Sequence, residues 1–185
     1  MFNLATRSKR LLIVVFLIIY LVSGITVFRK AKENRTAFLR WSHHTERIKH
    51  TETIYGAEGG SYPNLPFMLM ILMPFHSMDP ITGSLAWLTF KFTIILFIFW
   101  ATVKVAINNG PRWPDWALLV LVLLNSRVFI SDLTHGNVNL AIGGLVVVAL
   151  LCSFYKKDFL SGLSIGLATV LKVILYLISY INEDG

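Results

Sequence analysis

The sequence predicts an all-α protein that crosses a membrane several times, as a single membrane domain over residues 1–185. The composition is 55% hydrophobic with a mean hydropathy of +0.65. The apolar residues come in long blocks instead of the alternating patterns typical of soluble helices and strands. The hydrocarbon of a bilayer is about 30 Å thick and takes roughly 20 apolar helical residues to cross. Because no water is present there to satisfy backbone groups, we expect these blocks to be helices.

Five blocks are predicted as membrane-spanning helices. The first, residues 11–28, contains no charged residue and follows Arg7, Lys9 and Arg10. Basic residues before a first span favour a cytoplasmic N-terminus. The block is longer than the apolar region of a cleaved signal, so we interpret it as an uncleaved anchor. The other predicted spans are residues 84–107, a block that starts at Trp116 and becomes polar from Asn125, residues 140–155 and residues 159–181.

Residues 29–62 form a polar loop that we place on the outer side of the membrane. We expect this loop to contain an amphipathic helix that lies at the membrane interface. The apolar piece after the loop ends at Pro74 and is too short to span, so it is predicted as a re-entrant or interfacial half-helix. The apolar side of the amphipathic helix would consist of Phe38, Leu39, Trp41 and Ile48.

Two short polar segments separate the last three predicted spans. Residues 135–139 (HGNVN) carry small, hydrogen-bonding side chains, and Asn137 is a candidate cap for the helix that follows. Lys156, Lys157 and Asp158 are predicted to form a tight charged turn before the fifth span.

The half-helix decides the orientation of everything that follows it. If it does not span, Lys104, Arg112, Lys156 and Lys157 fall on the inner side, as the positive-inside rule expects. Residues 29–62 and 135–139 then lie outside. The seven Lys and Arg residues between positions 29 and 49 go against the rule in this arrangement. If the half-helix does span, the later helices reverse.

Three cations lie inside predicted spans, namely Lys91, Arg127 and Lys172. Charges in such positions cost at least a few kcal/mol and usually face a cavity or a partner. Their expected depth places them in the outer half of the membrane, where together they would suit a phosphate or diphosphate on a lipid. Two alternatives stay open: the side chains could extend to the headgroups, or Arg127 could pair with Asp132.

Several other function classes are not indicated. The net charge of +7 does not indicate nucleic-acid binding, because the basic residues lie beside apolar blocks, where they set topology or meet anionic headgroups. His43, His44 and His50 have no recognised zinc spacing, so we expect no metal. Cys152 is a single cysteine and cannot form an intrachain disulfide. The outer carboxylates are either solvated or include a general base; they are Glu33, Glu46, Glu52, Glu58 and Asp79.

Taken in order, these features resemble family-87 glycosyltransferases, which are polytopic enzymes of the GT-C superfamily. Residues 62–66 (YPNLP) and the short apolar helix ending at Pro74 are similar to the family's Tyr-Pro-Pro-like turn and the helix after it. Residues 135–139 look like its Gly-Gln-x-Asn-like break. Residues 161–168 and Lys172 resemble its later stretch of small residues with a lysine.

The resemblance implies transfer of a hexose, typically mannose, from a polyprenyl-phosphate donor to a lipid or glycan acceptor on the outer side of the plasma membrane. An outer-loop carboxylate would act as the base, and neither a metal nor another cofactor is implied. Together with the intramembrane cations, this predicts that four residues contact the donor phosphate: Lys91, Arg127, His135 and Lys172. The residues that would shape the cleft are Arg40, Tyr62, Pro63, Asn64, Asn137 and Asn139.

The sequence departs from the family pattern in two respects. Ala37 stands where members usually place an aspartate, and alanine cannot accept a proton, which leaves Glu33 as the candidate base. Members are also considerably longer and usually have a proline where Leu175 lies. We therefore expect the N-terminal half of a longer enzyme, or an inactive copy. The alternatives are a small non-catalytic membrane subunit, a transporter fragment and another lipid-linked transferase.

Overall fold

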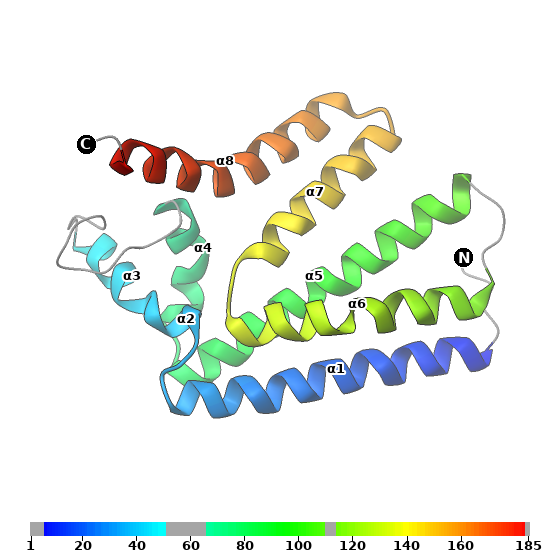
Figure 1. The fold of residues 1–185 in the computed structure, drawn as a ribbon, viewed down its shortest axis with the longest axis horizontal. Coiled ribbons are helices and arrows are strands. Elements are labelled where there is room, and N and C mark those ends of the chain that lie inside the picture. Colours follow the sequence, from blue (N-terminus) through cyan, green and yellow to red (C-terminus); the bar gives the residue numbers. More distant parts are fainter. Residues whose placement is uncertain (1–5, 51–65, 110–113, 184–185) are drawn as a thin grey trace.

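The computed structural model describes residues 6–50, 66–109 and 114–183, and these residues are helical without a strand (Figure 1). The all-α prediction is confirmed for this part of the chain. Residues 62–64, which we expected to shape the cleft, lie outside the described residues. The helices are α1 (Thr6–Lys32), α2 (Ala37–Arg40), α3 (Ser42–Lys49), α4 (Pro66–His76), α5 (Pro80–Asn109), α6 (Asp115–His135), α7 (Asn139–Phe154) and α8 (Asp158–Glu183).

Within the described residues, three helices are long and apolar enough to cross a membrane: α1, α5 and α6. They correspond to the first three predicted spans, so a polytopic membrane protein is confirmed. The helix α7 has 16 residues and is shorter than a typical span. The helix α8 has 26 residues, but its side chains are described only as far as Leu171. The fourth and fifth spans therefore stay predictions.

The helices α1, α5 and α6 lie side by side, and α1 packs against both of the others (Figure 1). Aromatic rings fill the contact between α1 and α5: the ring centroids of Phe16 and Phe99 are 5.2 Å apart, and those of Tyr20 and Phe92 are 4.9 Å apart. The hydroxyl groups of Tyr20 and Thr89 hydrogen-bond at 2.9 Å. These contacts fix α5 alongside α1.

The helix α4 confirms the predicted half-helix. Its 11 residues reach about 16 Å at 1.5 Å per residue, which is roughly half the thickness that a span must cover. The chain then turns sharply into α5, and a Cβ added at Gly83 would collide with the carbonyl oxygen of Phe75. The carboxylate of Asp79 accepts hydrogen bonds from the backbone N–H groups of Ile81 and Thr82, both at 3.2 Å. The orientation that the sequence predicts for a non-spanning α4 stays a prediction.

The predicted interfacial helix is instead two short helices, α2 and α3, that meet at Trp41. The side-chain oxygen of Thr36 caps α2 by accepting from the N–H of Leu39 at 3.2 Å. Phe38 is buried in a cluster with Met68 and other side chains. The expectation that the apolar side rests on the bilayer is wrong for these residues, because α4 covers it: Trp41 and Ile48 pack against Leu69 of that helix.

The predicted break at residues 135–139 is confirmed. Helix α6 ends at His135, and Gly136 follows with φ +76°, a left-handed conformation that favours glycine. A Cβ at Gly136 would also lie 3.0 Å from the backbone nitrogen of Phe38. The prediction that Asn137 caps the next helix is wrong, because the N-cap of α7 is Val138 and makes no side-chain hydrogen bond.

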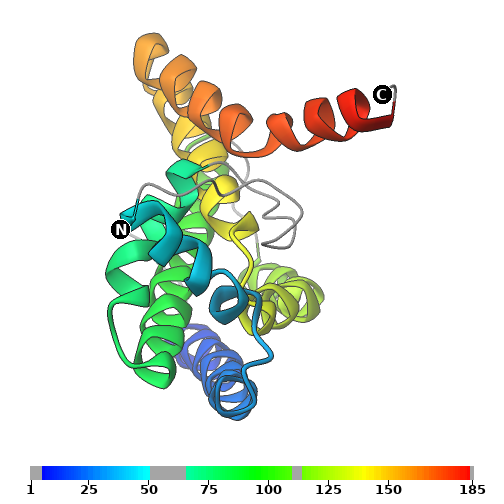
Figure 2. The same cartoon turned by 90° about the vertical axis from the view of Figure 1, so that its left-hand side faces the viewer.

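One end of the molecule gathers the end of α1, the helices α2 and α3, the start of α5 and the break between α6 and α7 (Figure 2). The opposite end holds Lys104, whose ammonium lies 5.4 Å from the ring centroid of Tyr155, beside the confirmed tight turn into α8. The described residues of the predicted inner and outer groups thus lie at opposite ends. Which end faces the cytoplasm stays a prediction.

Candidate functional site

Three side chains from other helices hold the carboxyl-terminal end of α6. A helix leaves its last carbonyl oxygens without partners inside the helix. The ammonium of Lys91 in α5 donates to the carbonyl oxygens of Asp132 at 2.5 Å and Leu133 at 3.4 Å. Lys30 of α1 donates to the Thr134 carbonyl at 3.4 Å, and the Trp87 indole donates to the Gly136 carbonyl at 3.2 Å. The end of α6 is therefore tied to both α1 and α5.

The cation Lys91 is completely buried, with 0% of its surface exposed. Its ammonium lies 3.5 Å from Oδ2 of Asp132, whose side chain is 13% exposed. An intramembrane charge needs such a partner. The sequence-based alternative that Arg127 pairs with Asp132 is wrong, because Lys91 takes that position. Lys91 acts on the backbone and carboxylate of α6 and does not line the hollow beside it.

An open hollow of about 320 Å³ lies against the last two turns of α6 and the start of α7. On α6, Arg127, Ser131 and His135 are spaced four residues apart, so they lie on one face of the helix. Four residues predicted for the site meet here: Arg127, His135, Asn137 and Asn139. The complete lining is Arg127, Val128, Ser131, Asp132, His135, Asn137 and Asn139.

The chemistry of this hollow, which we call the α6 hollow, combines a cation with neutral hydrogen-bonding groups. His135 donates from Nδ1 to the Ser131 carbonyl at 2.6 Å, which leaves Nε2 for a ligand. Arg127 is exposed and has no ion-pair partner among the described residues. It lies about 12 Å along the axis from His135. A guanidinium suits a phosphate, and the amides of Asn137 and Asn139 suit hydroxyl groups.

Other predicted site residues lie elsewhere. The Glu33 carboxylate pairs with Arg35 at 3.0 Å beyond the end of α1 and is exposed. Arg40 is exposed at the end of α2, and its carbonyl accepts from Nδ1 of His43 at 2.8 Å. Neither Glu33 nor Arg40 lines the α6 hollow. Lys172 belongs to α8, but its side chain lies outside the described part of the chain.

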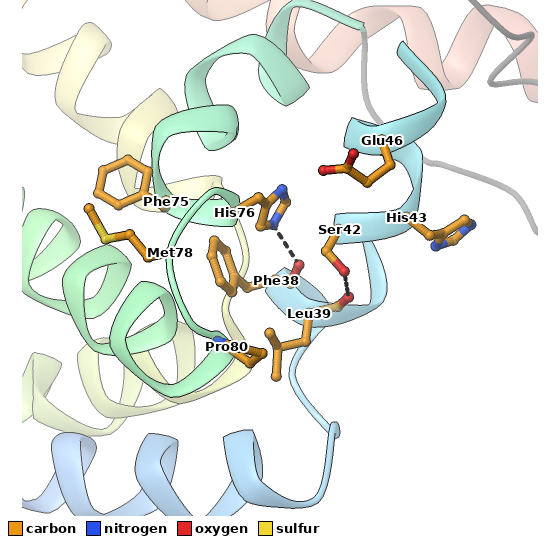
Figure 3. Close-up of a pocket in the computed structure, with 9 residues that line it drawn as sticks. All are labelled: Phe38, Leu39, Ser42, His43, Glu46, Phe75, His76, Met78 and Pro80. Carbon is orange, nitrogen blue, oxygen red and sulfur yellow. Dashed lines mark hydrogen bonds between the residues drawn. The ribbon is translucent and has the colours of Figure 1, made fainter. Parts of the chain in front are cut away.

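A second hollow of about 300 Å³, the α3 hollow, opens between α2–α3 and the turn from α4 to α5 (Figure 3). His76 joins its walls: its ring nitrogen Nε2 donates to the Phe38 carbonyl at 2.9 Å, and Nδ1 lies 2.6 Å from the Thr45 hydroxyl. A neutral ring accepts at Nδ1, so Thr45 donates there. The lining is Phe38, Leu39, Ser42, His43, Glu46, Phe75, His76, Met78 and Pro80.

Two titratable groups of the α3 hollow have shifted pKa values. Burial lowers the pKa of His76, and the hydrogen bond to Phe38 opposes this only in part. A hydrogen bond from Lys49, at 2.6 Å, lowers the pKa of Glu46. Figure 3 shows the Glu46 carboxylate on the side of α3 that faces His76. From the sequence, Glu46 was only one of several candidate outer acids. His76 was not predicted, and the pattern that could have indicated it is its place at the end of the half-helix.

The chain matches the sequence model of one protein family, described as Glycosyltransferase family 87, over residues 62–181. The match covers well over half of the 185 residues. It runs through α4 to α8 and includes every residue that lines the α6 hollow. A search of curated proteins and a search of solved structures each found no match.

Replacing Lys91 by methionine should destabilise the protein by about 3–5 kcal/mol, because Asp132, which is only 13% exposed, would then lose its cation. The double variant Lys91→Met/Asp132→Leu should recover part of that loss. Reversible unfolding of the purified protein in detergent measures both effects. Lys104→Met at the opposite end is the matched control and should change the free energy of unfolding by less than about 1 kcal/mol. Equal unfolding midpoints for Lys91→Met and the wild type would contradict the role given to this lysine.

The packing of α2 and α3 on α4 should weaken in acid. Because the pKa of folded His76 is below its ordinary value of 6.5, the unfolded chain binds more protons between the two values. The free energy of unfolding then falls as the pH drops through that window. Thermal unfolding measured from about pH 8 to about pH 5, across the ordinary histidine range, should show this slope. His76→Gln should flatten it, and an unchanged slope in that variant would rule out His76 as the group responsible.

Proposed function

The chain belongs to glycosyltransferase family 87, and on this premise we propose that it acts in moving a hexose, mannose in the first instance, from a polyprenyl phosphate to a lipid or glycan acceptor. In this reaction the bond between sugar C1 and the phosphate oxygen breaks. A bond forms between C1 and the acceptor hydroxyl oxygen, and a base takes the hydroxyl proton. The leaving phosphate gains one negative charge, which a fixed cation stabilises.

The observation that supports this proposal is the grouping of Arg127, His135, Asn137 and Asn139 around one hollow at the end of a membrane-spanning helix. A lipid-linked sugar presents its phosphate near the membrane surface, where the end of such a helix lies. Arg127 would bind the phosphate in a two-pronged hydrogen bond. His135 and the two amides would bind the groups around it.

The remaining site residues enter the proposal in different roles. Lys91 does not line the α6 hollow and would not contact the donor. It positions the hollow by donating a hydrogen bond to the end of α6. We assign Lys172 as a second cation for the phosphate. Arg40 and residues 62–64 would form the outer wall of the cleft. Glu33 is the proposed base, and to act it must release Arg35 and approach the donor.

We further place the α6 hollow on the outer side of a plasma membrane, with the N-terminus in the cytoplasm. The basic residues before α1 favour this orientation, and the short α4 is compatible with it. The lipid donor would then be used on the cell-envelope side.

A non-catalytic subunit that binds lipid-linked sugar is the second candidate function. Ala37, at the position where the family usually has an acid, is buried. A Cβ at Gly136 would lie 3.6 Å from the Ala37 nitrogen, so the loop passes close to the α6 hollow without offering a base from this position. Both candidates bind the donor, and only the first transfers the sugar to an acceptor.

Binding of a polyprenyl phosphate carrying mannose tests the proposed site. In purified protein reconstituted into nanodiscs, Arg127→Ala should weaken binding about tenfold or more, because a hydrogen bond to a charged group contributes about 1.5–3 kcal/mol. Lys172→Ala and His135→Ala should weaken it to a smaller extent. Lys104→Ala, at the opposite end of the molecule, is the matched control and should bind like the wild type. Unchanged affinity in both Arg127→Ala and Lys172→Ala would remove the site assignment.

Reporter fusions test the orientation. A reporter enzyme that works only after export should be active when it is joined within residues 135–139. A reporter that works only in the cytoplasm should be active when it is joined at Lys156. The reason is that these two turns lie at opposite ends of the helices (Figure 1). The reverse pattern would place the α6 hollow on the cytoplasmic side and would contradict use of a donor on the outer side.

A further inference from the structure

The carboxylate of Asp132 lines the α6 hollow, and its position there is electrostatically unfavourable. Asp132 lies in the last turn of α6, which ends at His135. The carboxyl-terminal end of a helix carries partial negative charge and favours cations over carboxylates. A membrane helix that keeps an acid at this place needs a compensating cation, and Lys91 supplies it from α5.

The pair is built so that the carboxylate keeps most of its capacity to accept hydrogen bonds. The closest contact of the Lys91 ammonium is the backbone oxygen of Asp132 at 2.5 Å. The distance to Oδ2 of the carboxylate is 3.5 Å, at the outer limit of a hydrogen bond. In the described part of the chain no other side chain donates to this carboxylate. An ionised carboxylate has about four acceptor positions, and this one is 13% exposed in the wall of the hollow.

Besides Arg127 and His135, the hollow offers neutral hydrogen-bonding groups. Ser131, Asn137 and Asn139 offer hydroxyl and amide groups, which donate and accept hydrogen bonds. Arg127 lies five residues earlier, about 7.5 Å along the helix axis and displaced around it, but both side chains line the same hollow, so one hexose joined to its phosphate would contact both. A negative group would be repelled at the Asp132 end and attracted at the Arg127 end. The hollow thus has one end for a phosphate and one end for a polyol.

We propose that Asp132 binds hydroxyl groups of the sugar on the lipid-linked donor, with Arg127 on the phosphate and Lys91 holding the carboxylate in place. This inference rests on the proposed function, and it adds a residue that recognises the sugar. The sugar hydroxyl groups donate hydrogen bonds to the carboxylate oxygens. The sugar-bearing lipid therefore gains contacts that the bare lipid phosphate lacks. Asp132 is then a determinant of preference for the sugar-bearing lipid.

The test compares two ligands, a polyprenyl phosphate and the same polyprenyl phosphate carrying mannose, on full-length protein in nanodiscs. The wild type should bind the mannose-bearing lipid more tightly than the bare one. Asp132→Asn should bind the bare lipid phosphate within about twofold of the wild type and lose roughly tenfold in affinity for the mannose-bearing lipid, the effect of one hydrogen bond to a charged group. Glu46→Gln, which removes a carboxylate from the α3 hollow, is the matched control and should change neither affinity.

Asp132→Glu provides a second variant, because it keeps the charge next to Lys91 and moves the carboxylate oxygens by one methylene. It should lose the preference for mannose even if Asp132→Asn does not fold. An unchanged preference in a folded variant overturns the inference and leaves the proposed function intact. Equal binding of the two ligands by the wild type would also overturn the inference and leave the proposed function intact. Binding of neither ligand by the wild type overturns the proposed function, and this inference with it.

Discussion

The fastening of the carboxyl-terminal end of α6 is the interaction on which the rest of the structure depends. Lys91, Lys30 and Trp87 together satisfy carbonyl oxygens that the helix itself leaves open. These side chains come from α1 and α5, so one helix end joins the three long helices into a unit. The same end sets the position of the α6 hollow, because its lining residues belong to the last turns of α6 and the first residues after it.

The buried lysine shows what sequence reasoning could and could not determine. A cation inside an apolar block predicts a partner, and this was correct for Lys91, which has one. The sequence did not identify that partner, since Asp132 is 41 positions away and helix-end carbonyls leave no sequence pattern. Helix geometry does not favour the alternative pairing of Arg127 with Asp132, because residues three or four apart are close neighbours on a helix and residues five apart are not, although both side chains line the same hollow.

Local signals predicted the elements well and their packing poorly. The length of the apolar blocks predicted α1, α5 and α6, and the shortness of the piece before Pro74 predicted α4. The glycine at position 136 marked the break after α6. The packing of the outer loop on α4 could not be predicted, because the apolar side of a helix can face either a bilayer or a neighbouring helix. In the structure this side packs on α4, where Leu69 contacts Trp41 and Ile48.

Phe38 connects the two hollows, and this contact bears on how a transferase could work with the described arrangement. Its backbone passes so close to Gly136 that only glycine fits there without displacement, and its carbonyl oxygen is held by His76. The loop after α1 is therefore fixed against the wall of the α6 hollow, and under the proposed function an acid at position 37 would lie beside the donor. Under the proposed function, Ala37 in that place would separate donor binding from proton removal: the α6 hollow would serve the first, and the second would need a carboxylate brought in from elsewhere. Under the proposed function, a transferase would differ from a binding subunit in whether such a carboxylate reaches the donor.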